Sequence, residues 1–228
     1  MLKPYLAVLA VTAALAPAIF AATEADKRLD ASADLLTDMM NASDKGVPQD
    51  LMNKSHCVIL VPGLKKAGFI VGAKYGRGFA FCRHTSGEGW TAPAAIRIEG
   101  GSFGLQIGAS EQDILLLVMN DSGMKRLLSN KFTIGAEATA AAGPVGRDAS
   151  AQTDVVLRAE MLSYSRSRGL FAGISLQGAT LRPDSDANEE MYGKKLENRE
   201  ILTGNVSAPA TAAKLETLLN RNSSRKTR

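Results

Sequence analysis

One stretch of the chain, residues 96–120, decides the fold: IRIEGGSFGLQIGASEQDILLLVMN. It predicts an apolar strand, a glycine-rich corner, a second strand and a polar turn at residues 110–112, followed by the apolar run of residues 114–119. Six apolar residues are too few to span a bilayer, but they suit a strand that is covered on both faces. We therefore predict that residues 114–119 form the central strand of a single core.

Glycines interrupt this stretch at Gly100, Gly101, Gly104 and Gly108. They leave little side chain on one edge of the region, which suits a tight bend, a bulge or close backbone packing. The stretch contains neither a nucleophile beside a base nor a cluster of metal ligands. It therefore favours a binding or packing device over an enzyme.

An amphipathic helix is predicted for residues 23–44. Its apolar side chains recur with the helical period at Leu29, Ala33, Leu36 and Met40. We expect this stripe to pack on the core. The alternative, a position on a membrane surface, is disfavoured because the polar face of the helix is acidic.

Two strand regions follow this helix. Residues 57–61 predict a buried strand that Pro62 and Gly63 end, and residues 65–81 predict a glycine-rich meander of antiparallel strands. Positive charges in the meander are expected at its turns, where they are solvated or meet an anionic head group. These charges belong to Lys65, Lys66, Lys74 and Arg77.

The second half of the chain mixes strands with helices. Strands are predicted for residues 131–143, 155–165 and 170–181, and helices for residues 122–129, 184–200 and 208–220. Helices at both ends and an antiparallel, glycine-rich sheet between them are the pattern of an α+β domain. No repeated period indicates a repeat fold.

The first 21 residues have the features of a secretory signal peptide. Lys3 precedes the apolar run of residues 5–15, and small residues surround the expected cleavage site after Ala21. An uncleaved membrane anchor is the alternative, but Pro17 and the short apolar run make a poor spanning helix. We therefore expect a periplasmic or secreted protein, which could also lie at the surface of an envelope membrane.

The chain divides into three parts on this basis. Residues 1–21 are the signal peptide, residues 22–204 form the main domain, and residues 205–228 form a last helix with a basic tail. No low-complexity linker separates these parts, so we expect one core.

The net charge of +4 does not indicate a protein that binds nucleic acid. Lys3 leaves with the signal peptide, and without it and the four basic residues of the tail the body carries about −1. A phosphate footprint along a duplex is therefore not expected. The tail is either a solvated end or a contact with anionic lipid. Its basic residues are Arg221, Arg225, Lys226 and Arg228.

The two cysteines, Cys57 and Cys82, allow two interpretations. In an oxidising compartment they could form a disulfide. With His56 and His84 they could instead form a zinc site, but His56 and Cys57 are neighbours on a predicted strand and would point to opposite faces.

A short motif around Ser102 resembles the G-x-S-x-G elbow of serine hydrolases. That elbow lies between a strand and a helix, and its histidine follows later in the chain. Both His56 and His84 precede Ser102, and the following residues predict a strand. We treat the match as accidental, and we identify no catalytic residue, metal site or cofactor-binding motif.

Several segments, in order, resemble the SYLF domain family over roughly residues 35–195. They are KAGFIVGAKYGRG, the Trp90 segment leading to Pro93, IEGGSFGLQIGAS, DILLLVMN, GAEATAAAGPVGR and YSRSRGLFAGISLQGATL. The resemblance implies that residues 22–204 form a lipid-binding module. Eukaryotic members of the family bind phosphoinositide-bearing membranes and some regulate actin, whereas bacterial members with a signal peptide look like exported lipid-binding proteins.

The resemblance also implies which residues meet the membrane. The family's contacts are attributed to an N-terminal amphipathic segment and to basic residues, which here suggests Lys65, Lys66, Lys74 and Arg77 as head-group ligands. The sequence shows no SH3 or FYVE module, so actin and phosphoinositides are not expected as natural partners. We expect non-catalytic binding of anionic phospholipid. The alternatives are a protein-interaction module of the cell envelope and a serine hydrolase built on Ser102.

Overall fold

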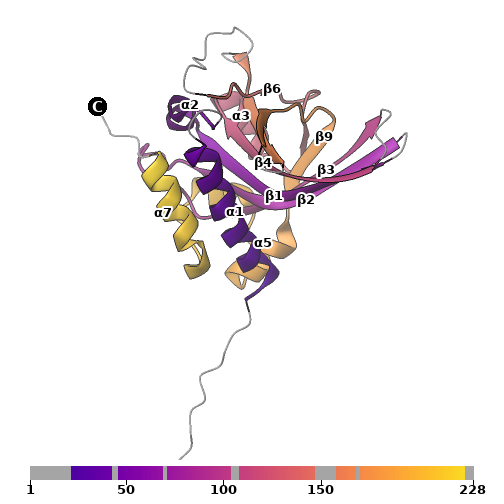
Figure 1. Ribbon diagram of the computed structural model, residues 1–228. Coiled ribbons are helices and arrows are strands. Elements are labelled where there is room, and N and C mark those ends of the chain that lie inside the picture. Colours follow the sequence, from indigo (N-terminus) through magenta and orange to yellow (C-terminus); the bar gives the residue numbers. More distant parts are fainter. Residues whose placement is uncertain are drawn as a thin grey trace, which may run out of the picture.

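The computed structural model describes residues 22–42, 46–68, 71–103, 108–146, 158–167 and 170–223 (Figure 1). Within these residues a curled β-sheet is flanked by helices from both halves of the chain, so the predicted α+β class is confirmed. The predicted signal peptide and residues 224–228 of the basic tail lie outside the described residues.

The sheet has the strand order β5-β9-β3-β2-β1-β4-β7-β6, and β8 pairs with β7. Its neighbouring strands are antiparallel except for β6 and β7, which run parallel, so the prediction of a purely antiparallel sheet is wrong at this pair. The strands are β1 (Cys57–Gly68), β2 (Val71–Cys82), β3 (Ala94–Phe103), β4 (Gly108–Val118), β5 (Phe132–Thr133), β6 (Ala140–Ala142), β7 (Met161–Ser167), β8 (Leu170–Gly173) and β9 (Ala179–Pro183).

Strand β4 contains most of the apolar run that was predicted to be central. It lies between β1 and β7, and residues 114–118 are fully buried, so the prediction is confirmed. The predicted polar turn at residues 110–112 is wrong. These residues continue β4, because each of them pairs with β1 in the same sheet or extends that pairing.

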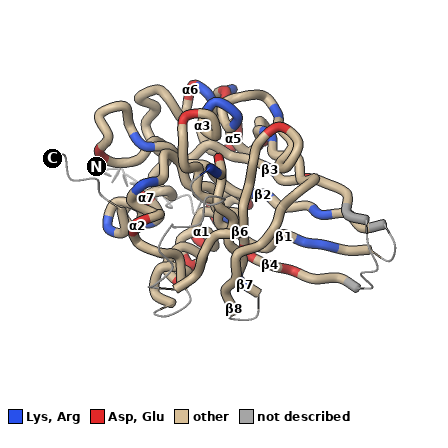
Figure 2. The backbone as a smooth tube through the Cα atoms, turned by 90° about the horizontal axis from the view of Figure 1, so that it is seen from above, with Lys and Arg blue, Asp and Glu red and all other residues tan. Residues whose placement is uncertain are grey.

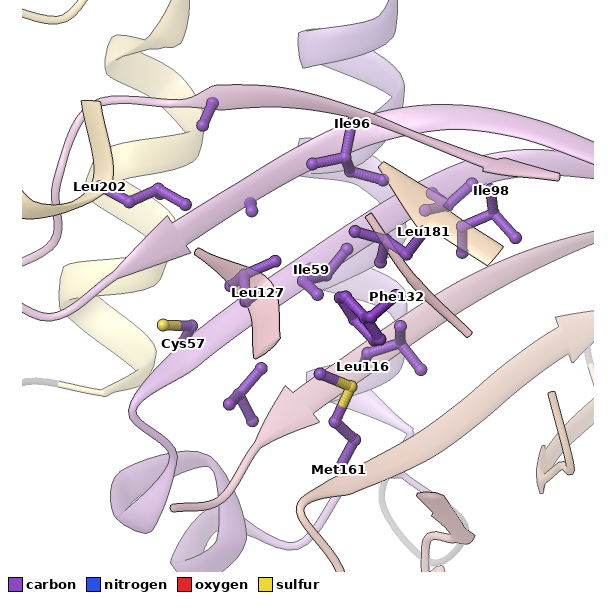
Figure 3. Packing of buried hydrophobic residues seen from close by; sticks show 14 of the residues in the cluster. Cys57, Ile59, Ile96, Ile98, Leu116, Leu127, Phe132, Met161, Leu181 and Leu202 are labelled. Carbon is purple, nitrogen blue, oxygen red and sulfur yellow. The ribbon is translucent and has the colours of Figure 1, made fainter. Parts of the chain in front are cut away.

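The sheet is covered on both faces because its apolar side chains alternate in direction. Val58 and Leu60 point to the face on which α1, α5 and α7 pack, which we call the helix face. Ile59 and Val61 point to the opposite, inner face, where they meet residues of α3, α6, β5 and β9. Figure 3 shows this inner-face cluster with Leu127, Phe132, Leu181 and Leu202 packed over the sheet.

The first helix, α1 (Glu24–Asn41), begins at a capping box. Thr23 accepts a hydrogen bond from the backbone of Asp26, and the Asp26 carboxylate accepts one from the backbone of Thr23. Leu29, Ala33 and Leu36 are buried as predicted. The stripe also includes the buried Met39, Met40 is partly buried against the same cluster, and the stripe packs on the core as expected.

Within the described residues, five further helices and one turn of 3-10 helix surround the sheet. The prediction of a continuous helix over residues 184–200 is wrong, because Gly193 adopts a left-handed conformation (φ +66°) that ends the first of two helices. The segments are α2 (Gln49–Lys54), α3 (Asp121–Leu127), α5 (Ser185–Tyr192), α6 (Asn198–Thr203), η1 (Ala210–Ala212) and α7 (Ala213–Asn222).

Two predicted strands are divided in the structure. Residues 131–143 form β5 and β6, separated by a turn at Gly135 (φ +89°). Residues 170–181 form β8, which pairs with β7, and the start of β9, which pairs with β3. We call the connection between β8 and β9, residues 174–178, the strap. Its Leu176 is buried in the inner-face cluster. The strand predicted for residues 155–165 is described only from residue 158, and its strand part begins at Met161.

The predicted end of the first strand at Pro62 and Gly63 is wrong, because β1 continues through them with a bulge. Val61 pairs with Ile114 of β4 and Leu64 pairs with Gln112, so β1 has one residue more than β4 between these pairs. Gly63 adopts a positive φ of +63°, and its N–H donates a 2.9 Å hydrogen bond to Oδ1 of Asp113. The extra residue reverses the faces of all later β1 side chains.

A disulfide joins Cys57 to Cys82, which are register partners on β1 and β2. The zinc interpretation is therefore wrong, because both sulfur atoms are used in the covalent bond. Both cysteines are buried in the inner-face cluster.

Removing the disulfide should destabilise the domain without changing its fold. For Cys57→Ala/Cys82→Ala we expect the free energy of unfolding to fall by about 3 kcal/mol, because the unfolded chain regains the freedom of a closed loop. Urea unfolding of both proteins measures the difference. An unchanged midpoint in the double variant would show that the bond adds nothing to stability.

Candidate anion-binding site on the projecting sheet

The outer ends of β1, β2, β3 and β4 extend beyond the rest of the sheet (Figure 1). Strand β9 pairs with β3 only as far as Gly100, and β7 pairs with β4 only from Asp113 onward. The outer residues of β1–β4 pair only with one another. In the described part of the sheet, no further strand flanks this group of four on either side. We call residues 64–68, 71–76, 101–103 and 108–112 the projecting sheet.

The sequence placed its four candidate ligands at turns, and this placement is wrong. Lys65 and Lys66 lie in β1, and Lys74 and Arg77 lie in β2. Lys66 is the register partner of Lys74, and Lys65 is that of Tyr75. Figure 2 shows basic segments on the neighbouring strands β1 and β2 and an acidic segment on β4.

The four residues do not share one face. Because side chains alternate along a strand, Lys66 and Lys74 lie on the inner face, with Leu64 and Ala80. Lys65 and Arg77 lie on the helix face, with Phe79. The structure thus brings two of the four candidates together and separates the other two from them.

Carboxylates accompany the cations of the helix face. Arg77 forms an ion pair through its Nε with Asp184, whose side chain is only 2% exposed. The hydrogen bond to Asp184 raises the pKa of Arg77. Glu99 lies 3.0 Å from Nε of Arg97 and 3.3 Å from Nε of Arg182.

Lys65 completes this pattern on the helix face. It is exposed, and its register partner on β4 is Glu111. Opposite charges on paired strands attract one another, so the field of Lys65 is partly compensated. The helix face is therefore a surface of mixed charge.

The two inner-face lysines differ from these cations. Among the described residues, neither Lys66 nor Lys74 has a carboxylate within ion-pair distance. Lys74 is 8% exposed, and its Nζ donates a 3.2 Å hydrogen bond to the carbonyl oxygen of Gln177 in the strap. Burial lowers the pKa of both lysines, and the charge of Lys66 lowers that of Lys74 further.

This arrangement can hold an anion. Two like charges on directly paired residues repel each other, and partial burial weakens their hydration. An anion between the two ammonium groups would remove the repulsion and replace the lost hydration. The geometry therefore supports binding of a negatively charged group by Lys66 and Lys74.

The structure does not provide the context of a hydrolase at Ser102. Ser102 lies in β3, and the next described element is strand β4 rather than the helix that a nucleophile elbow requires. Residues 104–107, which contain Gly104 of the motif, lie outside the described residues.

Sequence reasoning missed two polar residues near the lysines, Ser110 and Gln112. We had interpreted them as a turn, whereas Ser110 is the register partner of Lys66 and Gln112 occupies the next inner-face position on β4. A proline–glycine pair such as Pro62–Gly63 is also typical of a bulge within a continuing strand. A longer β1 needs a longer partner strand, so this signal could have placed Ser110 and Gln112 in β4.

No helix within the described residues combines the length and the hydropathy that a bilayer-spanning segment requires.

Comparison with known proteins identifies one matching family. The profile of a family described as "Ysc84: Las17-binding protein actin regulator" matches residues 99–222. This range includes β4 and the strap, and it ends in α7.

Curated relatives match a longer part of the chain. "SH3 domain-containing YSC84-like protein 1" of Rattus norvegicus is 34% identical over 181 residues, which is 79% of this chain and 53% of the relative. Its Homo sapiens counterpart is 32% identical over 181 residues, covering 79% and 52%. "Protein YSC84" of Saccharomyces cerevisiae is 30% identical over 182 residues, covering 78% and 38%. The chain thus spans about half the length of the first two and less of the third.

Proposed function

Because the chain belongs to the SYLF-domain family, also described as the Ysc84 family, we propose that it binds anionic phospholipid surfaces without catalysis. The contact is made by the projecting sheet, with Lys66 and Lys74 as the head-group ligands. The family resemblance suggests lipid as the ligand, and the lysine pair supplies the chemistry for its negative charge.

One observation carries this proposal. Lys66 and Lys74 are paired across β1 and β2 and partly buried, and neither has a carboxylate partner among the described residues. The charge of Arg77, in contrast, is compensated by the buried Asp184. An uncompensated pair is instead expected where the compensating charge comes from a ligand.

Binding would combine several weak terms. A lysine near an anionic membrane contributes about 1 kcal/mol, so Lys66 and Lys74 together contribute about 2 kcal/mol. Lys65 adds to the attraction from the helix face, although Glu111 reduces its effect. Tyr75, which is 48% exposed and pairs with Lys65, provides an apolar surface for shallow insertion.

Arg77 has a different role in this proposal. Its guanidinium is engaged by the buried Asp184, at the residue before α5. We assign it to the stability of the fold rather than to the head-group site.

We also propose that the protein is exported to the periplasm or secreted. The signal-peptide features of residues 1–21 suggest this location. The Cys57–Cys82 disulfide supports it, because such bonds persist mainly in oxidising compartments.

A protein-interaction module is the second candidate. The family description names a Las17-binding actin regulator. The outer parts of β3 and β4 pair with β2 and β1, and in the described sheet no strand pairs with their other edges. Such edges can accept a strand from another protein. Recovery of a partner from lipid-free extract would favour this candidate.

Vesicle flotation tests the lipid proposal directly. We expect the wild-type protein to float with vesicles that contain phosphatidylglycerol and to stay behind with pure phosphatidylcholine vesicles. Recovery should fall as the salt concentration rises from about 0.05 M to 0.5 M, because salt screens the attraction. Equal recovery with both kinds of vesicle, or recovery that does not depend on salt, would contradict the electrostatic mechanism.

A further inference from the structure

A buried amide group lies on the same face as the lysine pair. Gln112 is the register partner of Leu64, an inner-face residue. Its Nε2 is buried and has no hydrogen-bond partner. A buried donor without an acceptor costs about 1–3 kcal/mol, and an acceptor bound there would remove this cost.

Pairing register places this amide close to the lysines. Lys66 lies between Lys74 on β2 and Ser110 on β4, and Gln112 is diagonal to it. Directly paired and diagonal positions on one face are about 5 Å and 7–8 Å apart, within reach of long side chains. Lys66 is therefore within reach of both Lys74 and Gln112.

Glycines lie next to these side chains on the neighbouring strands. In the next inner-face row, Gly68 pairs with Gly72 on one side and with Gly108 on the other. Gly100 is the register partner of Lys74 on β3, and the strap covers it, because a Cβ atom at Gly100 would lie 2.8 Å from the carbonyl oxygen of Gly178. A group bound beside the two lysines would therefore meet backbone rather than long side chains.

Both lysines keep donors available in this arrangement. An ammonium group has three N–H donors, and Lys74 uses one of them on Gln177. The remaining donors of Lys66 and Lys74 and the amide of Gln112 suit an anion with several acceptor oxygens. A phosphomonoester has three such oxygens and about −1.5 to −2 charge at pH 7, which matches two ammonium groups.

We propose that Lys66, Lys74 and Gln112 form a discrete site for one phosphate group, of the dianionic phosphomonoester class. The site deepens the proposed lipid function and rests on it only for the source of the phosphate. A lipid head group or a small soluble phosphate ester could supply it. Gln112 binds one oxygen and orients the group, and the lysines neutralise its charge.

Lysine footprinting of the full chain tests the site without any lipid. The protein is treated with acetic anhydride in the presence of methyl phosphate, and acetylation is measured for each lysine by mass spectrometry. We expect methyl phosphate to protect Lys66 and Lys74 and to leave Lys65 unchanged. Lys65 is the matched control, because it is the neighbouring residue on the opposite face.

Two further measurements separate the discrete site from diffuse attraction. Dimethyl phosphate and methyl sulfate, which carry one negative charge, should protect the lysines much less than methyl phosphate at the same ionic strength. In Gln112→Met the concentration of methyl phosphate that gives half protection should rise about tenfold, because a hydrogen bond to a charged group is lost.

The outcomes distinguish this inference from the proposed function. Absence of protection by methyl phosphate, or equal protection of Lys65, would overturn the discrete site even if the protein still floats with acidic vesicles. Preference for phosphatidic acid vesicles over phosphatidylglycerol vesicles of equal charge, lost in Gln112→Met, would identify a lipid as the source. Protection by methyl phosphate without that preference would identify a soluble ester.

Discussion

Replacing Arg77 by alanine is expected to lower the free energy of unfolding by about 3–5 kcal/mol. The substitution removes the ion-pair partner of Asp184, whose carboxylate is 2% exposed. A buried carboxylate without its partner loses hydration and gains nothing in return. Arg28, whose pKa is lowered first by burial and then by the charge of Arg77, also interacts with Asp184 and would offset part of the loss.

Urea unfolding of Arg77→Ala measures this effect, with Arg182→Ala as the matched control. Arg182 is an arginine on the same face, but it is 38% exposed and pairs with the partly exposed Glu99. Its removal should cost less than about 1 kcal/mol. At a temperature where both variants are folded, both should bind acidic vesicles as the wild type does. If Arg77→Ala retains its stability but loses vesicle binding, then Arg77 belongs to the head-group site.

Strong local patterns were sufficient to predict the framework of this fold. The apolar run of residues 114–118 indicated a strand buried on both faces, and the helical period of Leu29, Ala33 and Leu36 indicated α1. In both cases every residue in the pattern favours the same structure. The pairing of β6 with β7 joins residues that are distant in sequence. The parallel direction of this pair could not be predicted from the local sequence of either strand.

The sequence did not predict that residues 131–143 divide into two strands or that residues 184–200 divide into two helices. Gly193 ends α5 and Gly135 and Gly178 turn the chain, all with positive φ, but glycine is also common inside this sheet. At Gly78, for example, a Cβ atom would lie 1.9 Å from the carbonyl oxygen of Leu60, so this glycine serves close packing within a strand. Composition alone does not separate these two uses.

The candidate site depends on the bulge in β1, which cannot be predicted from the alternation of side-chain direction along a strand. The sequence named Lys66 and Lys74 as candidates, but the faces on which they lie follow from the bulge at Pro62 and Gly63, which the sequence predicts as the end of a strand. Without the extra residue, Lys65 would point to the inner face and Lys66 to the helix face. Compensation of Arg77 by Asp184 likewise joins residues 107 positions apart.

Charge reversal at the lysine pair should have the largest effect on membrane binding. Each lysine contributes about 1 kcal/mol near an anionic surface, so replacing two positive by two negative charges changes the binding free energy by about 4 kcal/mol. This corresponds to about a thousandfold loss of affinity. This loss is expected for Lys66→Glu/Lys74→Glu. Lys66→Gln/Lys74→Gln removes the two positive charges without adding negative ones, so its affinity should fall about thirtyfold.

A matched control separates the site from net charge. Lys125 and Lys131 are exposed and lie outside the projecting sheet, in α3 and just before β5. Lys125→Glu/Lys131→Glu changes the net charge by the same amount. Far-UV circular dichroism of all the variants would establish that they are folded before binding is compared.

The most direct measurement is therefore the partition of these variants onto vesicles that contain phosphatidylglycerol. We predict that Lys66→Glu/Lys74→Glu stays unbound at lipid concentrations that recover the wild type and Lys125→Glu/Lys131→Glu. Equal losses in the two charge-reversed variants would show that only net charge matters. Undiminished binding of folded Lys66→Glu/Lys74→Glu would show that the inner-face lysines do not contact the membrane.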